Sequence, residues 1–152
     1  MNVRGPSQGP SARVSDWSEL EAASYGMPPA LLQLARREGV TDILINGSDV
    51  WVDQGGGLEP SGLDLGSADE CRVLAIRLAA AAGQRLDDAS PIVDGTIRGD
   101  IRLHAVLPPL AQSGVTISLR IIRTSPFQMS QLVASGTLDA DTADHLRTLV
   151  LL

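Results

Sequence analysis

Lysine is absent from this sequence of 152 residues, in which all 12 basic residues are arginine. The phosphate-binding loop of the form GxxxxGK(S/T) needs a lysine that reaches the phosphates of the nucleotide. No register of the chain can therefore supply such a loop. If the chain handles nucleotide, it does so as the accessory half of a site whose other half lies elsewhere.

Aromatic residues and cysteine are also scarce. Aromatics make up 3% of the chain and the net charge is −6, which disfavours both base stacking and a surface for phosphate backbones. We therefore expect no nucleic acid partner for this domain.

Cys71 is the single cysteine, which excludes an internal disulfide, and we interpret it as a small buried side chain rather than a reactive thiol. It makes no metal-ligand spacing with His104 or His145, so no metal site is predicted.

No apolar run approaches the roughly 20 residues that a membrane-spanning helix requires, and the N-terminus lacks the apolar core of a signal peptide. These features favour a cytoplasmic protein. The hydrophobic fraction of 43% is that of a globular chain, with a core of Leu, Ile, Val and Ala.

Composition divides the chain into four parts. Residues 1–15 are rich in Gly, Pro and Ser and read as a flexible leader. Residues 16–39 predict an N-terminal helical segment, residues 40–125 an α/β sheet domain, and residues 126–152 a helical linker. Because the last helical pattern ends on leucines without a stop signal, we expect the native chain to continue.

Helix signals are clearest in three places. Ser67 and Glu70 form a capping box, and Gly83 is placed to end the helix that follows. The tail predicts a short helix from Met129 to Ala134 and a second helix from about Ala140, capped by Asp139.

Alternating polar and apolar residues predict the strands that carry the candidate site. Ile92 to Arg98 and Ile101 to Leu107 flank Gly99-Asp100, a two-residue connection typical of a hairpin. Arg102 lies on the polar face of the second arm, and Arg120 lies on the polar face of a later strand. The fold class is α+β, with a sheet of about five or six mostly antiparallel strands covered by helices.

The triple glycine Gly55-Gly56-Gly57 is interpreted as a flexible hairpin loop. Neither a lysine nor a helix follows it directly, and a phosphate-binding loop requires both.

Several stretches resemble one family when taken together. They are Val40 to Gly47, Gly83 to Asp94, Arg102 to Leu110, Thr116 to Arg120 and Leu132 to Leu138. In order and spacing this pattern resembles the PAS-like N-terminal domain of secretion ATPases. Among these it is most similar to the CpaF-like branch, which serves Tad-type pili, and to its relatives in type II and type IV secretion.

The resemblance implies a specific role. The parent protein would continue into a RecA-like motor domain, assemble as a homo-hexamer and bind ATP and Mg²⁺ between its two domains. It would work on inner-membrane secretion or pilus platform proteins, associated peripherally with the inner face of the membrane. The resemblance makes Arg120 the first candidate to reach the ATP phosphates, Arg102 the second, and Arg85 a third of less clear role. This chain alone should not hydrolyse ATP.

Two alternatives stand beside this interpretation. Arg102 and Arg120 could instead pair with Asp87, Asp88 or Asp94 on a solvated sheet face, as exposed ion pairs commonly do. The domain could also be a PAS-like small-ligand sensor or a protein-docking module.

Overall fold

The computed structural model describes residues 14–122 and 128–150, with side chains described from residue 18 onward. These two ranges belong to separate compact units, and each is described by itself. The predicted boundary at residue 125 lies outside the described residues. So does the predicted leader, residues 1–15, except for its last two residues, which belong to the first helix.

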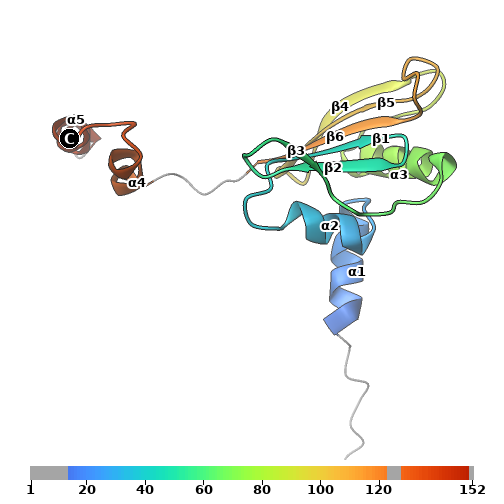
Figure 1. Cartoon of the computed structure of the whole chain (residues 1–152), viewed down its shortest axis with the longest axis horizontal. Helices are drawn as coiled ribbons and strands as arrows, with labels where there is room; N and C mark the ends of the chain where they lie inside the picture. Colours follow the sequence, from blue (N-terminus) through green and yellow to red (C-terminus); the bar gives the residue numbers. More distant parts are fainter. Residues whose placement is uncertain (1–13, 123–127, 151–152) are drawn as a thin grey trace, which may run out of the picture. The chain divides into compact units, whose positions relative to one another are not determined.

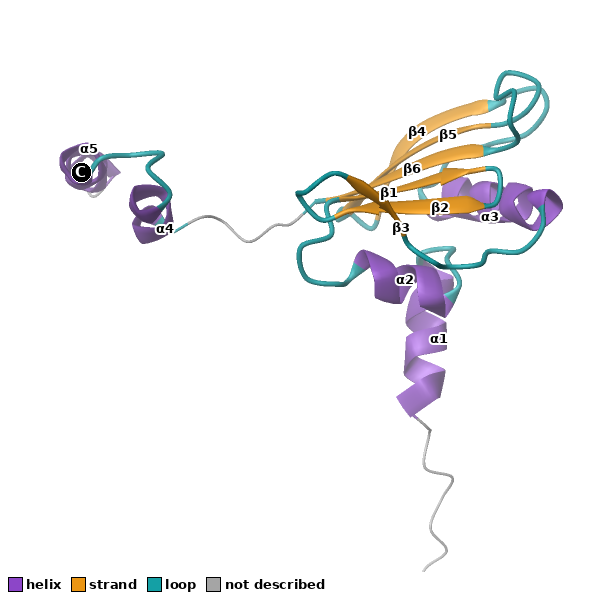
Figure 2. Cartoon of the chain, in the orientation of Figure 1, coloured by secondary structure: helices purple, strands orange, loops and turns teal. Residues whose placement is uncertain are grey.

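The first unit is an antiparallel sheet with helices (Figures 1 and 2). Its elements in chain order are α1 (Val14–Ser24), α2 (Pro29–Ala35), β1 (Asp42–Asn46), β2 (Asp49–Asp53), β3 (Leu58–Pro60), α3 (Ala68–Ala81), β4 (Ile92–Ile97), β5 (Ile101–Val106) and β6 (Thr116–Ile121). The strand order is β3-β2-β1-β6-β5-β4, and every pairing is antiparallel. The predicted α+β class with five or six strands is confirmed.

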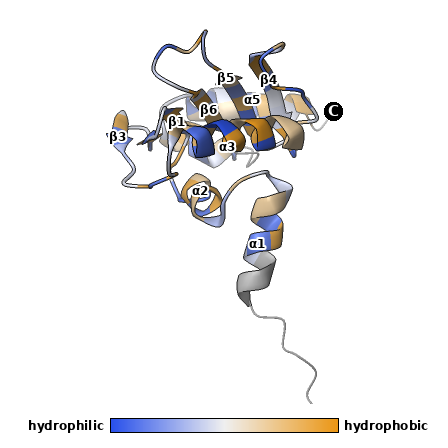
Figure 3. Cartoon of the chain, turned by 90° about the vertical axis from the view of Figure 1, so that its right-hand side faces the viewer, coloured by the Kyte–Doolittle hydropathy of each residue, from blue (hydrophilic) through white to orange (hydrophobic). Residues whose placement is uncertain are grey.

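One face of the sheet is buried and the other is open. On β5, Ile101, Leu103 and Ala105 are buried, whereas Arg102 and His104 are exposed, as the alternation predicts. Helices α2 and α3 lie on the same side of the sheet (Figure 3). They supply much of the core through the apolar side chains Leu31, Leu32, Leu34, Ala35, Leu74, Ala75, Leu78 and Ala79. Because these helices cover one face, the polar residues of the strands remain on the surface of the other.

Helix α3 begins at the predicted capping box. The Ser67 backbone N–H donates to Glu70 Oε2 at 2.7 Å, and the Glu70 N–H donates to Ser67 Oγ at 3.4 Å. The Ser67 backbone N–H lowers the pKa of the Glu70 carboxyl, and so does the Ser67 hydroxyl, which donates to Glu70 Oε2 at 2.8 Å. Cys71 follows in the first turn and is fully buried, which confirms its interpretation as a packed side chain.

The turn between β4 and β5 differs from the prediction by one residue. Ile97 pairs with Ile101, so the connection consists of Arg98, Gly99 and Asp100 rather than Gly99-Asp100 alone. Arg98 and Gly99 both have positive φ, 49° and 87°. Asp100 accepts a hydrogen bond from the Tyr25 hydroxyl at 2.7 Å, which connects the turn to the end of α1. Local sequence patterns do not predict this bond, because the two residues are far apart in the chain.

The second unit holds the two helices predicted for the tail, α4 (Met129–Ala134) and α5 (Ala140–Val150). Asp139 caps α5, because its Oδ1 accepts the Thr142 N–H at 2.7 Å. That bond lowers the pKa of Asp139. In the two described ranges, no helix combines the length and the apolar character needed to span a membrane.

Candidate functional site

Arg102 and Arg120 meet on the open face of the sheet. They are directly paired across β5 and β6, so their Cα atoms lie about 5 Å apart. The next pair on the same face, His104 and Ser118, lies beside them. These four side chains line a surface hollow of about 290 Å³.

Each arginine of the hollow is paired with a carboxylate. Arg120 Nε donates to Asp42 Oδ1 at 2.9 Å, and Arg102 Nη2 donates to Asp94 Oδ1 at 2.9 Å. His104 Nδ1 lies 3.9 Å from the second oxygen of Asp94, which makes an ion pair only when the imidazole is protonated. The alternative in which the arginines form ion pairs predicts Asp87, Asp88 or Asp94 as partners. The structure confirms Asp94 as the partner of Arg102.

The sheet topology creates this arrangement. Because β6 lies between β1 and β5, Arg120 is opposite Asp42 on one side and Arg102 on the other. Asp94 reaches Arg102 diagonally, since the residue opposite Arg102 on β4 is Thr96. The two arginines are therefore flanked by the two carboxylates across four strands.

Like charges directly opposite each other on neighbouring strands destabilise a sheet. Here each arginine is compensated by a carboxylate, and no carboxylate lines the hollow among the residues that the structure describes. Arginine presents a planar set of N–H donors that matches carboxylate or phosphate oxygens. Each ion pair occupies one nitrogen of its arginine, and the remaining N–H groups of Arg102 and Arg120 make the hollow a candidate anion site.

The structure does not bring Arg85 to this hollow. Arg85 lies in the connection after α3, where its Nε donates to Asp87 Oδ2. That bond lowers the pKa of Asp87. The neighbouring carboxylate Asp88 pairs with Arg72 of α3. Asp87 and Asp88 therefore form ion pairs outside the hollow and do not pair with Arg102 or Arg120. A nucleotide contact by Arg85 stays a prediction.

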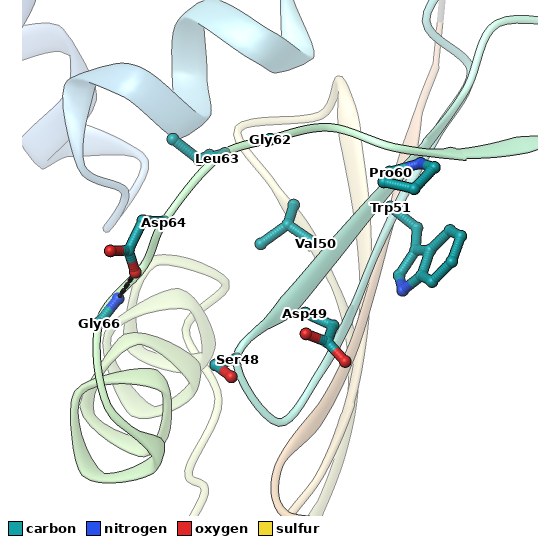
Figure 4. A pocket seen from close by; sticks show the side chains of 9 residues that line it. All are labelled: Ser48, Asp49, Val50, Trp51, Pro60, Gly62, Leu63, Asp64 and Gly66. Atoms are coloured by element: carbon teal, nitrogen blue, oxygen red, sulfur yellow. Dashed lines mark hydrogen bonds between the residues drawn. The ribbon is translucent and has the colours of Figure 1, made fainter.

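Two further hollows lie near the β1–β3 half of the sheet. Figure 4 shows the first, of about 500 Å³, between the start of β2 and the segment that leads to α3. The charged residues among its described lining are Asp49 and Asp64, and no arginine is among them, so the hollow does not fit a phosphate. In the same view Val50 and Trp51 project to opposite sides of β2.

The other hollow is apolar and lies on the open face. It has a volume of about 490 Å³ and is lined in part by Leu44, Trp51 and Leu58. The side chains of Trp51 and Leu58 are both exposed. Large exposed apolar groups that gather on one face commonly mark a contact surface for another protein.

The triple glycine is a connection between β2 and β3, as predicted. Asp53 Oδ1 accepts the backbone N–H of Gly55 at 2.7 Å and that of Gly57 at 3.2 Å. The N–H groups that a phosphate-binding loop would offer to its ligand are thus directed at a carboxylate of the chain itself.

The role of Asp42 was not anticipated from the sequence. Asp42 and Arg120 are 78 residues apart, and their contact depends on the pairing of β1 with β6. The only sequence signal is the alternation along β1, which places Asp42 on the open face of the sheet with Leu44 and Asn46, whereas Ile43 and Ile45 are buried.

Comparison with known proteins identifies relatives by sequence and a solved structure with a similar fold. No protein-family model matches the chain. It is 44% identical over 117 residues to two Mycobacterium tuberculosis proteins, "Putative conjugal transfer protein MT3759" of strain CDC 1551 / Oshkosh and "Putative conjugal transfer protein Rv3659c" of strain ATCC 25618 / H37Rv. Each match covers 72% of this chain and 33% of the relative, so the chain spans about a third of the length of these relatives.

A solved structure with a similar fold is the VirB11 ATPase from the Brucella suis type IV secretion system, in complex with sulphate. The TM-score is 0.63 at 12% identity, and the match covers 80% of this chain and 36% of the other. The fold is shared with a type IV secretion ATPase. The expected likeness to secretion ATPases is therefore confirmed for the fold, whereas the CpaF-like assignment stays a prediction.

Proposed function

We propose that this chain is the N-terminal domain of a hexameric secretion or pilus-assembly ATPase of the CpaF-like branch. In this proposal its open sheet face covers the ATP site at the cleft with a RecA-like motor domain. The observation that carries the proposal is the direct pairing of Arg102 and Arg120 beside a hollow that suits an anion. The shared fold and the two relatives named for conjugal transfer support the secretion setting.

Arg102 and Arg120 would bind the phosphates of ATP by charge-assisted hydrogen bonds. Such bonds are about twice as strong as those between neutral groups, and an arginine supplied to a phosphoryl-transfer site can be worth about 10³ to 10⁵ in rate. The arginines fit the cofactor, because their N–H donors and the hollow of about 290 Å³ lie on an exposed face. ATP itself supplies the phosphoanhydride bond that is hydrolysed.

Magnesium would be held outside this chain's described residues. Within them, no three His, Cys, Asp or Glu side chains gather into a set that could ligate a metal ion. The proposal assigns the ion to the motor domain, together with the lysine-bearing phosphate loop that this chain cannot contain.

Subunit contacts in a hexamer need a surface, and the apolar hollow at Leu44, Trp51 and Leu58 offers one. The same hollow favours the second candidate function, a PAS-like protein-docking module without a role in ATP hydrolysis. Replacement of the arginines separates the two candidates, because a docking module would not need them for nucleotide turnover. Platform proteins at the inner face of the membrane are the partners expected for the ATPase.

Two activity measurements test the proposal. The purified chain with ATP and Mg²⁺ should release no phosphate above the blank, and robust turnover would contradict the division of the site between two domains. In the full-length protein, Arg120→Ala should abolish most ATP hydrolysis while the thermal unfolding midpoint stays unchanged. Unaltered turnover would assign Arg120 a structural role.

A further inference from the structure

The two arginines of the hollow are paired through different atoms. Arg120 donates its Nε to Asp42, which leaves both terminal amino groups without another partner among the described residues. Arg102 donates a terminal nitrogen, Nη2, to Asp94. The carboxylate of Asp94 therefore occupies an atom that a phosphate would use, whereas the carboxylate of Asp42 does not.

We propose that Asp42 is a positioning residue that holds Arg120 by its Nε and keeps the terminal amino groups available to a phosphate group in the hollow. This inference rests on the proposed function, because the phosphate belongs to the ATP of that site. Asp94, by contrast, competes with the phosphate for Arg102.

Burial and register distinguish the two carboxylates further. The Asp42 side chain is 23% exposed, against 54% for Asp94. Asp42 is directly opposite Arg120 in the β1–β6 pairing, so the backbone ladder fixes the distance between them. Arg120 itself is 71% exposed and would otherwise explore many rotamers. An anchor at Nε restricts those rotamers before the anion arrives, and this preorganisation lowers the entropic cost of binding.

Electrostatics alone gives the opposite expectation for Asp42. Removal of any carboxylate near the hollow makes it more positive and should tighten anion binding. A positioning carboxylate should instead weaken binding when it is removed, in spite of the favourable change in charge. The direction of the change therefore decides the role of Asp42, and Asp94→Asn is a matched control with the same change of charge on the same face.

The experiment is a calorimetric titration of the 152-residue chain with inorganic tripolyphosphate at low ionic strength. Asp42→Asn keeps an acceptor oxygen but removes the charge that strengthens the hydrogen bond to Arg120 Nε, and it should weaken binding about three- to fivefold. Asp94→Asn should tighten binding about two- to threefold, as an exposed charge removed nearby would. Equal or tighter binding by Asp42→Asn would overturn the proposal.

A second background isolates the Nε contact. In Arg120→Lys the charge remains but the Nε–H is lost, so Asp42→Asn should no longer weaken binding there. Weakening that persists in this background would overturn the proposal. Should Asp42→Asn fail to fold, Arg120→Lys must lower the affinity more than Arg102→Lys, and equal losses would count against the anchor.

Failure of the inference and failure of the proposed function give different results. If the wild-type chain does not bind tripolyphosphate at all, both the phosphate role of the arginines and the role of Asp42 fall. If the wild-type chain binds tripolyphosphate and Arg120→Ala abolishes this binding, the phosphate role of Arg120 is supported. If Asp42→Asn then leaves the affinity unchanged, only the positioning role of Asp42 is contradicted.

Discussion

Arg102 and Arg120 are direct cross-strand partners on the open face of the sheet, although both carry a positive charge. Each is compensated by a carboxylate, Asp94 for Arg102 and Asp42 for Arg120. Because both arginines are mostly exposed, their ion pairs contribute little to stability. The needs of the fold therefore leave the pairing of the two arginines unexplained, and the proposed phosphate site would explain it.

Replacement of Arg102 separates these two explanations. Arg102→Gln removes the like-charge pair, so the free energy of unfolding should change by no more than about 0.5 kcal/mol. The affinity for tripolyphosphate should fall about tenfold, because one of two guanidinium groups is lost. Chemical denaturation and a binding titration on the same sample measure both effects. A stability loss above about 1 kcal/mol with unchanged affinity would make Arg102 a structural residue.

Tyr25 should report on the contact between α1 and the β4–β5 turn. Its hydroxyl donates to Asp100 at 2.7 Å, and burial, followed by this hydrogen bond, raises its pKa above the ordinary value of 10.0. Tyr25→Phe should cost about 1 to 3 kcal/mol, because Asp100 Oδ2 would lose the tyrosine hydroxyl, while the buried Asp100 Oδ1 already has no hydrogen-bond partner in residues 14–122 and 128–150.

The pH dependence of this contribution has a defined sign. A raised pKa in the folded state means that the stabilisation is complete below pH 10 and is lost as the pH rises through the raised value. The difference in unfolding free energy between wild type and Tyr25→Phe should therefore shrink above about pH 10. Tyr25 is the only tyrosine, so the absorbance of tyrosinate follows its titration directly. An ordinary titration midpoint would contradict the burial of Tyr25 and its hydrogen bond to Asp100.

Gly26 and Gly83 offer a matched pair of glycines with the same positive φ of 70°. A Cβ at Gly26 would lie 2.5 Å from the Arg77 carbonyl oxygen of α3, whereas a Cβ at Gly83 would meet no atom of the described part of the chain within 4 Å. Gly83→Ala should cost about 1 kcal/mol from the backbone conformation alone. Gly26→Ala should cost about 3 kcal/mol, because overpacking adds to that cost. Equal losses in chemical denaturation would show that the connection between α1 and α2 does not approach α3 this closely.

Cys71 should be unreactive in the native protein. The residue is fully buried, and burial, with smaller effects of Glu70 and Asp64, raises the pKa of its thiol. Because the thiolate is the reactive form, modification by a disulfide reagent should be slow without denaturant and rapid after unfolding. Rapid labelling of the native protein would contradict its position in the core.

Local chemistry explains which parts of the fold could be predicted. The capping box at Ser67 and Glu70 is read from two residues, and the structure forms both of its hydrogen bonds. The alternation on β5 and β6 places Arg102 and Arg120 on one polar face, because a strand has a period of two. These features depend on neighbours in sequence and need no knowledge of the strand order.

The partners of the site depend on strand order, which local patterns do not contain. Asp42 reaches Arg120 only because β1 inserts beside β6 in the order β3-β2-β1-β6-β5-β4. Asp87 and Asp88 do not depend on strand order, because Asp87 pairs with Arg85 two residues away and Asp88 pairs with Arg72 of α3. The three-residue turn at Arg98 to Asp100 is fastened by Tyr25, which lies 75 residues from Asp100.

The most direct test of the account is a nuclear magnetic resonance titration that follows the arginine side chains of the chain as tripolyphosphate is added. We expect saturable shifts of the guanidinium resonances of Arg102 and Arg120, with little change at Arg85, which does not line the hollow. Uniform small shifts of all arginines, or a response confined to Arg85, would contradict a phosphate site between β5 and β6.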